Sequence, residues 1–194
     1  MRGRVLACAA LMLFGVSAEA QKLDSYLGDM QEALVPHATM KSTSCHSVEI
    51  DMNGPWGDFA IPSGVNKTNE IEWAVLRVDV LRLYVNLSDL NEDKLQNKAI
   101  FSLEYISRHE KGTPYNPDTP AVMLFTHGLN TAMTVHAVDL DKVHALRGKR
   151  GTESDMGLSI DERKFVIIPF QDQAHADAFS KAILKAVVLC KAQS

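Results

Sequence analysis

The hexapeptide Phe165-Val166-Ile167-Ile168-Pro169-Phe170, with the segment from Asp172 to Lys191 that follows it, decides the fold that we expect of this chain. The hexapeptide is apolar throughout and predicts a short strand. Asp172 has the side chain of a helix N-cap, whose carboxylate accepts hydrogen bonds from the first free amides of a helix. Apolar residues then recur at the spacing of one helix face, at Ala176, Phe179, Ile183, Ala186, Val187 and Cys190.

The opposite face of this predicted helix is charged. Asp177, Lys181 and Lys185 lie four residues apart, and the acid precedes the bases, which is the favourable order for an exposed pair. Because one face must be buried while the other is solvated, the helix needs a surface to pack against. Most of the preceding chain predicts strands, so we expect the helix to lie across a sheet.

The first predicted strands lie between residues 44 and 87. Residues 44–52 alternate in polarity and stop at the turn signal Asn53-Gly54-Pro55. The apolar members of residues 56–64 either lie against the core or form an edge strand. Residues 71–87 are rich in Val, Ile, Trp and Tyr, but their apolar phase shifts near residues 77–79. Since a one-residue shift moves every side chain to the other face, we predict two strands separated there by a turn or bulge. The alternative, a helix through the first half of this segment, fits the pattern less well.

The later strands are separated by polar segments. Residues 99–105 alternate cleanly, and residues 121–126 and 132–140 are two more strand-like runs. The turn His127-Gly128-Leu129-Asn130 has the length of a hairpin connection, so we expect these two runs to pair. Two further segments, residues 109–120 and 147–157, contain glycines together with prolines or charged residues, so we predict that they are surface loops.

The amino terminus has the pattern of a secretory signal peptide. Arg2 and Arg4 precede an apolar run from Val5 to Val16, and an Ala-x-Ala site ends at Ala20. A transmembrane anchor needs about 20 apolar residues, which is longer than this run. We therefore predict cleavage after Ala20 and a secreted or periplasmic protein. No second apolar run is long enough to span a bilayer, so no transmembrane segment is expected in the mature chain.

The charge of the mature chain bears on its partners. Removal of two arginines and one glutamate leaves 18 basic and 23 acidic residues, which changes the net charge from −4 to −5. This mild acidity disfavours nucleic acid and anionic membranes as the main partner. We therefore expect a protein partner, if there is one, and no nucleic acid.

These elements define an α+β fold and three parts of the chain. A signal peptide (residues 1–20) precedes an N-terminal helical segment (21–43), in which apolar residues at helical spacing predict a short helix over residues 22–35 that ends at Pro36. A single β-rich domain (44–194) follows. We expect an antiparallel bent β-sandwich or partial barrel of about seven strands, capped by the C-terminal amphipathic helix.

The order of elements over residues 44–191, with its final strand–helix unit, resembles the pleckstrin-homology-like superfold. The resemblance implies a strongly bent antiparallel sandwich whose open corner is closed by the C-terminal helix. Lipid-binding members of that superfold cluster Lys and Arg between the first two strands. Here that region, residues 53–69, has Lys67 as its only base, so lipid head-group binding is not expected.

Two cysteines remain after the predicted cleavage, Cys45 and Cys190. Outside the cytosol, two thiols favour a disulfide, which here would join an early strand to the last turn of the final helix. Closing so long a loop contributes about 4 kcal/mol. The alternative is that Cys190 is simply a small buried member of the helix stripe.

Catalytic patterns are incomplete in this sequence. The run from Ala121 to Phe125 followed by His127-Gly128 resembles the oxyanion-hole strand of an α/β-hydrolase, whose amides stabilise a developing oxyanion. The hydrolase pattern Gly-x-Ser-x-Gly is absent, and the nearest serine is Ser159. Ser159, Asp172 and His175 follow the order of the family's triad, but the acid and the histidine are only three residues apart. His127-Gly128 is therefore interpreted as a turn.

The seven histidines give no metal-binding spacing. The closest grouping is His136 with His144, near Asp139 and Asp141, and His136 fits a histidine hydrogen-bonded on a sheet. Nothing singles out one of the carboxylate pairs, Glu70 with Glu72, Asp89 with Glu92 or Asp139 with Asp141, for acid–base chemistry. We therefore predict no metal and no cofactor.

Two loop features are candidates for binding. Arg147, Lys149 and Arg150 form a small basic patch for an acidic partner, although such a loop is commonly only a solvated connection. Tyr115, among three prolines, either presents an aromatic contact or packs onto the sandwich.

Three hypotheses for the function follow from these patterns. Because each catalytic pattern lacks a part, the leading hypothesis is a non-enzymatic binding or interaction domain that uses its loops or a sheet edge. The alternatives are a small secreted hydrolase of esterase type and a structural component of the cell envelope held by a Cys45–Cys190 bridge.

Overall fold

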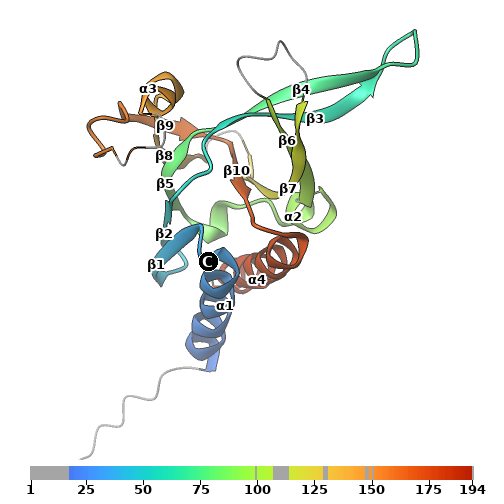
Figure 1. The fold of residues 1–194 in the computed structure, drawn as a ribbon. Coiled ribbons are helices and arrows are strands. Elements are labelled where there is room, and N and C mark those ends of the chain that lie inside the picture. Colours follow the sequence, from blue (N-terminus) through green and yellow to red (C-terminus); the bar gives the residue numbers. More distant parts are fainter. Residues whose placement is uncertain are drawn as a thin grey trace, which may run out of the picture.

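The computed structural model of the chain describes residues 18–98, 100–106, 114–128, 131–146, 149 and 151–193 (Figure 1). These residues form ten strands, four α-helices and one 3-10 helix. In chain order, the elements are α1 (Ala18–Leu34), β1 (Ala38–Ser44), β2 (Ser47–Met52), β3 (Gly57–Val65), β4 (Ile71–Val78), β5 (Val80–Val85), η1 (Leu87–Asp89), α2 (Glu92–Lys98), β6 (Ile100–Ile106), β7 (Pro114–Phe125), β8 (Met133–Ala137), α3 (Leu140–Ala145), β9 (Ser159–Arg163), β10 (Phe165–Pro169) and α4 (Gln173–Lys191).

The strands form two antiparallel sheets of five strands each. Sheet A has the order β1-β2-β5-β8-β9, and sheet B has the order β10-β7-β6-β3-β4. The predicted α+β class, with antiparallel sheets and helices at both ends of the described chain, is confirmed. The predicted number of strands is wrong, because ten strands are present where about seven were expected.

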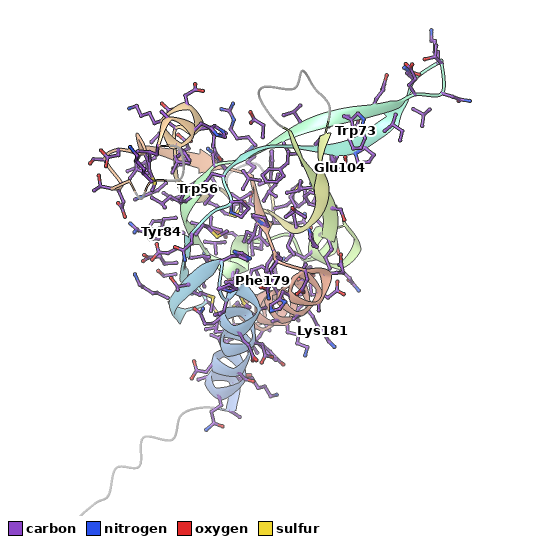
Figure 2. All side chains as sticks on the ribbon, in the orientation of Figure 1. Trp56, Trp73, Tyr84, Glu104, Phe179 and Lys181 are labelled. Carbon is purple, nitrogen blue, oxygen red and sulfur yellow. A yellow bond between two sulfur atoms is a disulfide. The ribbon has the colours of Figure 1, made fainter. Side chains whose placement is uncertain are left out.

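The C-terminal strand and helix agree with the prediction in detail. The Asp172 carboxylate accepts a hydrogen bond from the His175 amide at 2.9 Å, so Asp172 is the N-cap of α4. All six members of the predicted apolar stripe are buried. Phe179 is fully buried, and its ring lies 5.2 Å from that of Phe170, at the end of β10. Figure 2 shows Phe179 on the side of α4 that faces the strands.

The main core lies between the two sheets and the helices. It takes buried residues from α1, from the inner strands of sheet A, from one face of β7 and β10, and from α4. α1 packs beside α4 on one side of the strands (Figure 1).

α1 begins at Ala18, and residues 1–17, which hold most of the predicted signal peptide, lie outside the described residues. The helix ends at Leu34, which confirms the predicted N-terminal helix that stops before Pro36.

Two strands of sheet B, β7 and β10, carry buried residues on both faces. Val166 and Ile168 of β10 belong to the main core, whereas Ile167 between them belongs to a second cluster on the other face. This second cluster contains the buried residues Phe59, Val78, Leu103, Ala121 and Ile167. Although β10 and β4 are the two edges of sheet B, they contact each other. The sheet therefore curves around the second cluster.

The predicted break near residues 77–79 is confirmed, and it has a clear role. β4 ends at Val78 in sheet B, and β5 begins at Val80 in sheet A. Val78, Asp79 and Val80 are all buried, so the alternation of exposed and buried residues stops here. The shift in apolar phase therefore marks the place where the chain passes from one sheet to the other.

The Cys45–Cys190 disulfide is also present. The two sulfur atoms are bonded at 2.06 Å, and the Cα atoms lie 5.4 Å apart. Cys45 lies in the turn between β1 and β2, and Cys190 lies in the last turn of α4. The bond therefore joins the edge of sheet A to the C-terminal helix.

Three predictions about strands are wrong. Residues 38–43, assigned to the N-terminal helical segment, belong to β1, a polar edge strand whose sequence has little apolar alternation. Residues 114–120, predicted as part of a loop, belong to β7. β10 pairs with residues 121–125 of β7, so among the described strands Pro114 and Pro117 lie where one edge of β7 has no paired strand and a missing N–H is tolerated. Finally, β7 and β8 do not form a hairpin, because they lie in different sheets.

Candidate functional site

The predicted loop site is only partly described. Arg147 and Arg150 lie outside the described residues, so the structure does not test the basic patch that they form with Lys149. Lys149 is exposed, and its amide donates a hydrogen bond to the Leu146 carbonyl at 2.9 Å. The backbone of Tyr115 lies in β7 opposite Tyr105, but its side chain is outside the described part. These residues therefore provide no geometry from which to build a site.

The structure does not assemble the hydrolase residues. Ser159 is exposed at the start of β9, where its hydroxyl donates to the Asp161 carboxylate at 3.4 Å. His175 and Asp172 are in contact at 2.7 Å, but they lie at the start of α4, away from β9 in Figure 1. The hydrogen bond from His175 lowers the pKa of Asp172 below its ordinary value. The acid and the histidine therefore form a helix cap, and Ser159 is not beside them.

The predicted histidine grouping does not form a metal centre either. Asp139 caps α3 by accepting a hydrogen bond from the Asp141 amide at 3.0 Å, and His136 lies with its ring 5.4 Å from that of Tyr84. Within the described part of the chain, His144 Nε2 is buried without a hydrogen-bond partner. The described residues contain no group of three or more histidine, cysteine or acidic side chains that could hold a metal ion.

A groove lies between the two edges of sheet B, and we call it the edge groove. It has a volume of about 510 Å³. One wall is the end of β4, and the other is the start of β10 with the residues just before it. The lining residues are Val75, Leu76, Arg77, Asp79, Val80, Arg163, Lys164, Phe165, Val166 and Ile167.

One end of the edge groove is fixed by an ion pair. The Arg163 guanidinium binds Asp79 through two hydrogen bonds, with Nη1–Oδ1 and Nη2–Oδ2 distances of 2.5 and 2.9 Å. Arg163 also donates to Asp161 at 2.9 Å. The hydrogen bond to Asp79 is the largest of the effects that raise the pKa of Arg163 above its ordinary value. Since Asp79 follows β4 and Arg163 precedes β10, the pair joins the two places where the chain crosses between the sheets.

The groove walls are largely apolar and partly exposed, and their charged members are Arg77, Asp79, Arg163 and Lys164. Val75 is 63% exposed and Phe165 is 48% exposed, which is high for large apolar side chains on strands. Deeper in the groove, Ile167 belongs to the second cluster, and Leu76 packs against it. The groove therefore continues the apolar interior of sheet B to the surface.

The backbone also contributes to this site. β4 pairs only with β3, and β10 pairs only with β7, so each wall has one strand edge without a neighbouring strand among the described residues. Such an edge presents amide and carbonyl groups that can pair with another extended chain. The Asp79 carboxylate at the end of the groove is held by Arg163.

Sequence reasoning found the strands of this site but not their proximity. Val75 and Phe165 lie in segments that were predicted as strands, yet they are distant in the chain and belong to opposite edges of sheet B. The available signal was the uninterrupted apolar run from Phe165 to Phe170, which places an apolar residue at the exposed end of a strand. That signal alone does not indicate which strand lies opposite.

Comparison with protein-family models, with curated proteins and with solved structures gives no match for this chain. Among its described helices, none is both long and apolar enough to cross a membrane.

Proposed function

We propose that this chain is a non-enzymatic binding domain of the secreted or periplasmic space, and that it binds an extended segment of a partner protein in the edge groove. The observation that supports the proposal most directly is the position of two unpaired strand edges on either side of an apolar groove. An extended segment placed there adds a strand to sheet B, as in other complexes formed by strand addition.

The geometry favours a polypeptide over a compact apolar ligand. A bound strand directs alternate side chains to opposite faces, so one set packs on Leu76 and Ile167 while the other faces solvent. Its amides and carbonyls pair with the free edge of β4 or β10, which supplies affinity without requiring one particular sequence. The Asp79–Arg163 pair keeps the closed end of the groove in place, so little of the site has to be ordered on binding.

Binding of a labelled peptide tests this proposal. The probe is a ten-residue peptide of alternating valine and serine flanked by lysines, with fluorescence anisotropy as the readout. Val75→Asp places a charge in the apolar wall and should weaken binding by about tenfold or more. Val188→Asp is the matched control, because Val188 is 52% exposed on α4 and does not line the edge groove.

A second probe tests strand addition itself. The same peptide with alternate backbone nitrogens methylated keeps its side chains but loses the donors of one edge, so it should bind about tenfold more weakly. The proposal is wrong if both peptides bind equally, if neither binds, or if Val75→Asp and Val188→Asp have the same effect. Amino-terminal sequencing of the exported protein tests its location, and the expected first residue is Gln21.

A further inference from the structure

A second cavity lies between α1 and α4, away from the edge groove. The two helices run antiparallel, because the start of α1 lies near the end of α4 and residues 29–33 of α1 share a cavity with residues 174–185 of α4. We call this cavity the helix cleft, and its volume is about 410 Å³. A cleft of this size lies within the range of small-molecule sites.

The two walls of the helix cleft carry opposite charges. Asp29 and Glu32 lie on the α1 side, and Lys181 and Lys185 lie on the α4 side. Figure 2 shows Lys181 on the side of α4 that faces away from the strands. These four residues are all described, and no carboxylate of the pair on α1 lies within 4.0 Å of either lysine Nζ. The charges therefore face one cavity without neutralising each other directly.

Small side chains keep the helix cleft open. Ala33 and Ala182 are buried at its base, where α1 and α4 meet, and Ala174 and Ala178 are exposed at its mouth. A larger side chain at Ala178 would fill the entrance. The Lys185 side chain extends toward α1, because its Nζ lies 5.5 Å from the centre of the Tyr26 ring. The cleft is therefore a charged trough with an apolar floor.

From this arrangement we infer that the helix cleft binds a short peptide with free termini, most closely a dipeptide. Its carboxylate binds Lys181 and Lys185, and its ammonium group binds Asp29 and Glu32, through charge-assisted hydrogen bonds. Packed helices have axes about 8–10 Å apart, and a dipeptide extends over about 7 Å, so a dipeptide spans the two walls. This site is separate from the edge groove, and the inference does not depend on the proposed function.

Titration calorimetry with alanyl-alanine tests the inference. The blocked analogue, N-acetyl-alanyl-alanine amide, has the same apolar groups without terminal charges, so its binding should be about tenfold weaker. Lys181→Gln and Asp29→Asn should each weaken binding of the free dipeptide by about fivefold or more. Asp177→Asn is the matched control, because Asp177 is exposed on α4 outside the cleft, and it should leave binding unchanged.

Ala178→Leu provides a test that does not change any charge. Ala178 is exposed, so the variant should keep its circular dichroism spectrum while it blocks the cleft and abolishes binding. Higher salt should weaken binding of the free dipeptide, because the contacts are between partly exposed charges. Three results would each overturn the inference: no binding of alanyl-alanine at about 10 mM, equal binding of the blocked analogue, or unchanged binding by Ala178→Leu.

Discussion

At the scale of single residues, Asp79, between β4 and β5, is the one acidic or basic residue that is buried in the described part of the chain. Its side chain is only 7% exposed, and its carboxylate is held at two points by Arg163. A buried carboxylate that loses its partner keeps the cost of desolvation without the compensating attraction. Asp58 and Arg77 form a comparable acid–arginine pair on β3 and β4, but their distance is 3.5 Å and Arg77 is 62% exposed.

Arg163→Met should therefore destabilise the protein much more than Arg77→Met does. We expect a loss of about 3 kcal/mol for Arg163→Met, which leaves Asp79 buried and unpaired. For Arg77→Met we expect less than about 1 kcal/mol, because exposed pairs contribute little. Urea denaturation at neutral pH measures both values. Equal losses would show that the Asp79–Arg163 pair does not fix the end of the edge groove.

At the scale of elements, α4 joins the parts of the molecule. It packs against α1, α2, η1 and strands of sheet B, and Cys190 in its last turn is bonded to Cys45 beside sheet A. The two cysteines are 145 residues apart in the chain, so the bond closes most of the described chain into one loop. Such a loop restricts the unfolded chain strongly, while it adds little to the packing already present around α4.

Reduction of the wild-type protein should lower its free energy of unfolding by about 4 kcal/mol. In the double variant Cys45→Ser/Cys190→Ser, the stability should already be low, and the same reductant should change it no further. Guanidinium denaturation with and without dithiothreitol measures both effects. A reductant effect of equal size in the double variant would mean that the loss does not come from the disulfide.

The sequence was most informative where an element has a strong local signal. α4 was predicted from its cap at Asp172 and its apolar stripe, and the passage at Asp79 was predicted from a shift in phase. β1 was missed because a polar edge strand buries few side chains, and α2 and α3 were missed because helices of seven and six residues show too few turns for a period. The resemblance to the pleckstrin-homology-like superfold stays a prediction.

The sequence predicted where strands and helices lie better than it predicted which strands pair. In sheet A, β5 lies between β2 and β8, which are far from it in the chain, and sheet B brings β10 beside β7. These neighbours are set by the packing of the whole chain, and no local pattern specifies them. For the same reason, the sequence indicated a sheet edge as a binding surface but did not identify the walls of the edge groove.

At the scale of the whole molecule, sheet B separates two apolar clusters of different size. The main core draws residues from both sheets and from α1 and α4, whereas the second cluster draws its buried members from β3, β4, β6, β7 and β10 alone. The edge groove opens onto the second cluster, the smaller of the two. Local opening of β4 therefore exposes few apolar contacts, so the region around the groove should have lower local stability than the main core.

Two phenylalanines allow this difference to be measured with the same chemical change. Phe59 is a buried member of the second cluster, and Phe179 is a fully buried member of the main core. Phe59→Ala and Phe179→Ala should each lower the free energy of unfolding by about 3–5 kcal/mol. Their effects on amide hydrogen exchange should differ, because Phe59 supports only sheet B while Phe179 lies in the core that the two sheets share.

Hydrogen exchange measured by mass spectrometry should thus show faster exchange in β3, β4 and β6 of Phe59→Ala, with β2 and β5 of sheet A still protected. In Phe179→Ala, exchange should rise in both sheets. Peptide binding is a second readout, because the walls of the edge groove pack on the second cluster. Under conditions where both variants are folded, Phe59→Ala should therefore weaken peptide binding more than Phe179→Ala does. Identical exchange patterns in the two variants would mean that the two clusters act as one cooperative unit, and the edge groove would then have no local stability of its own.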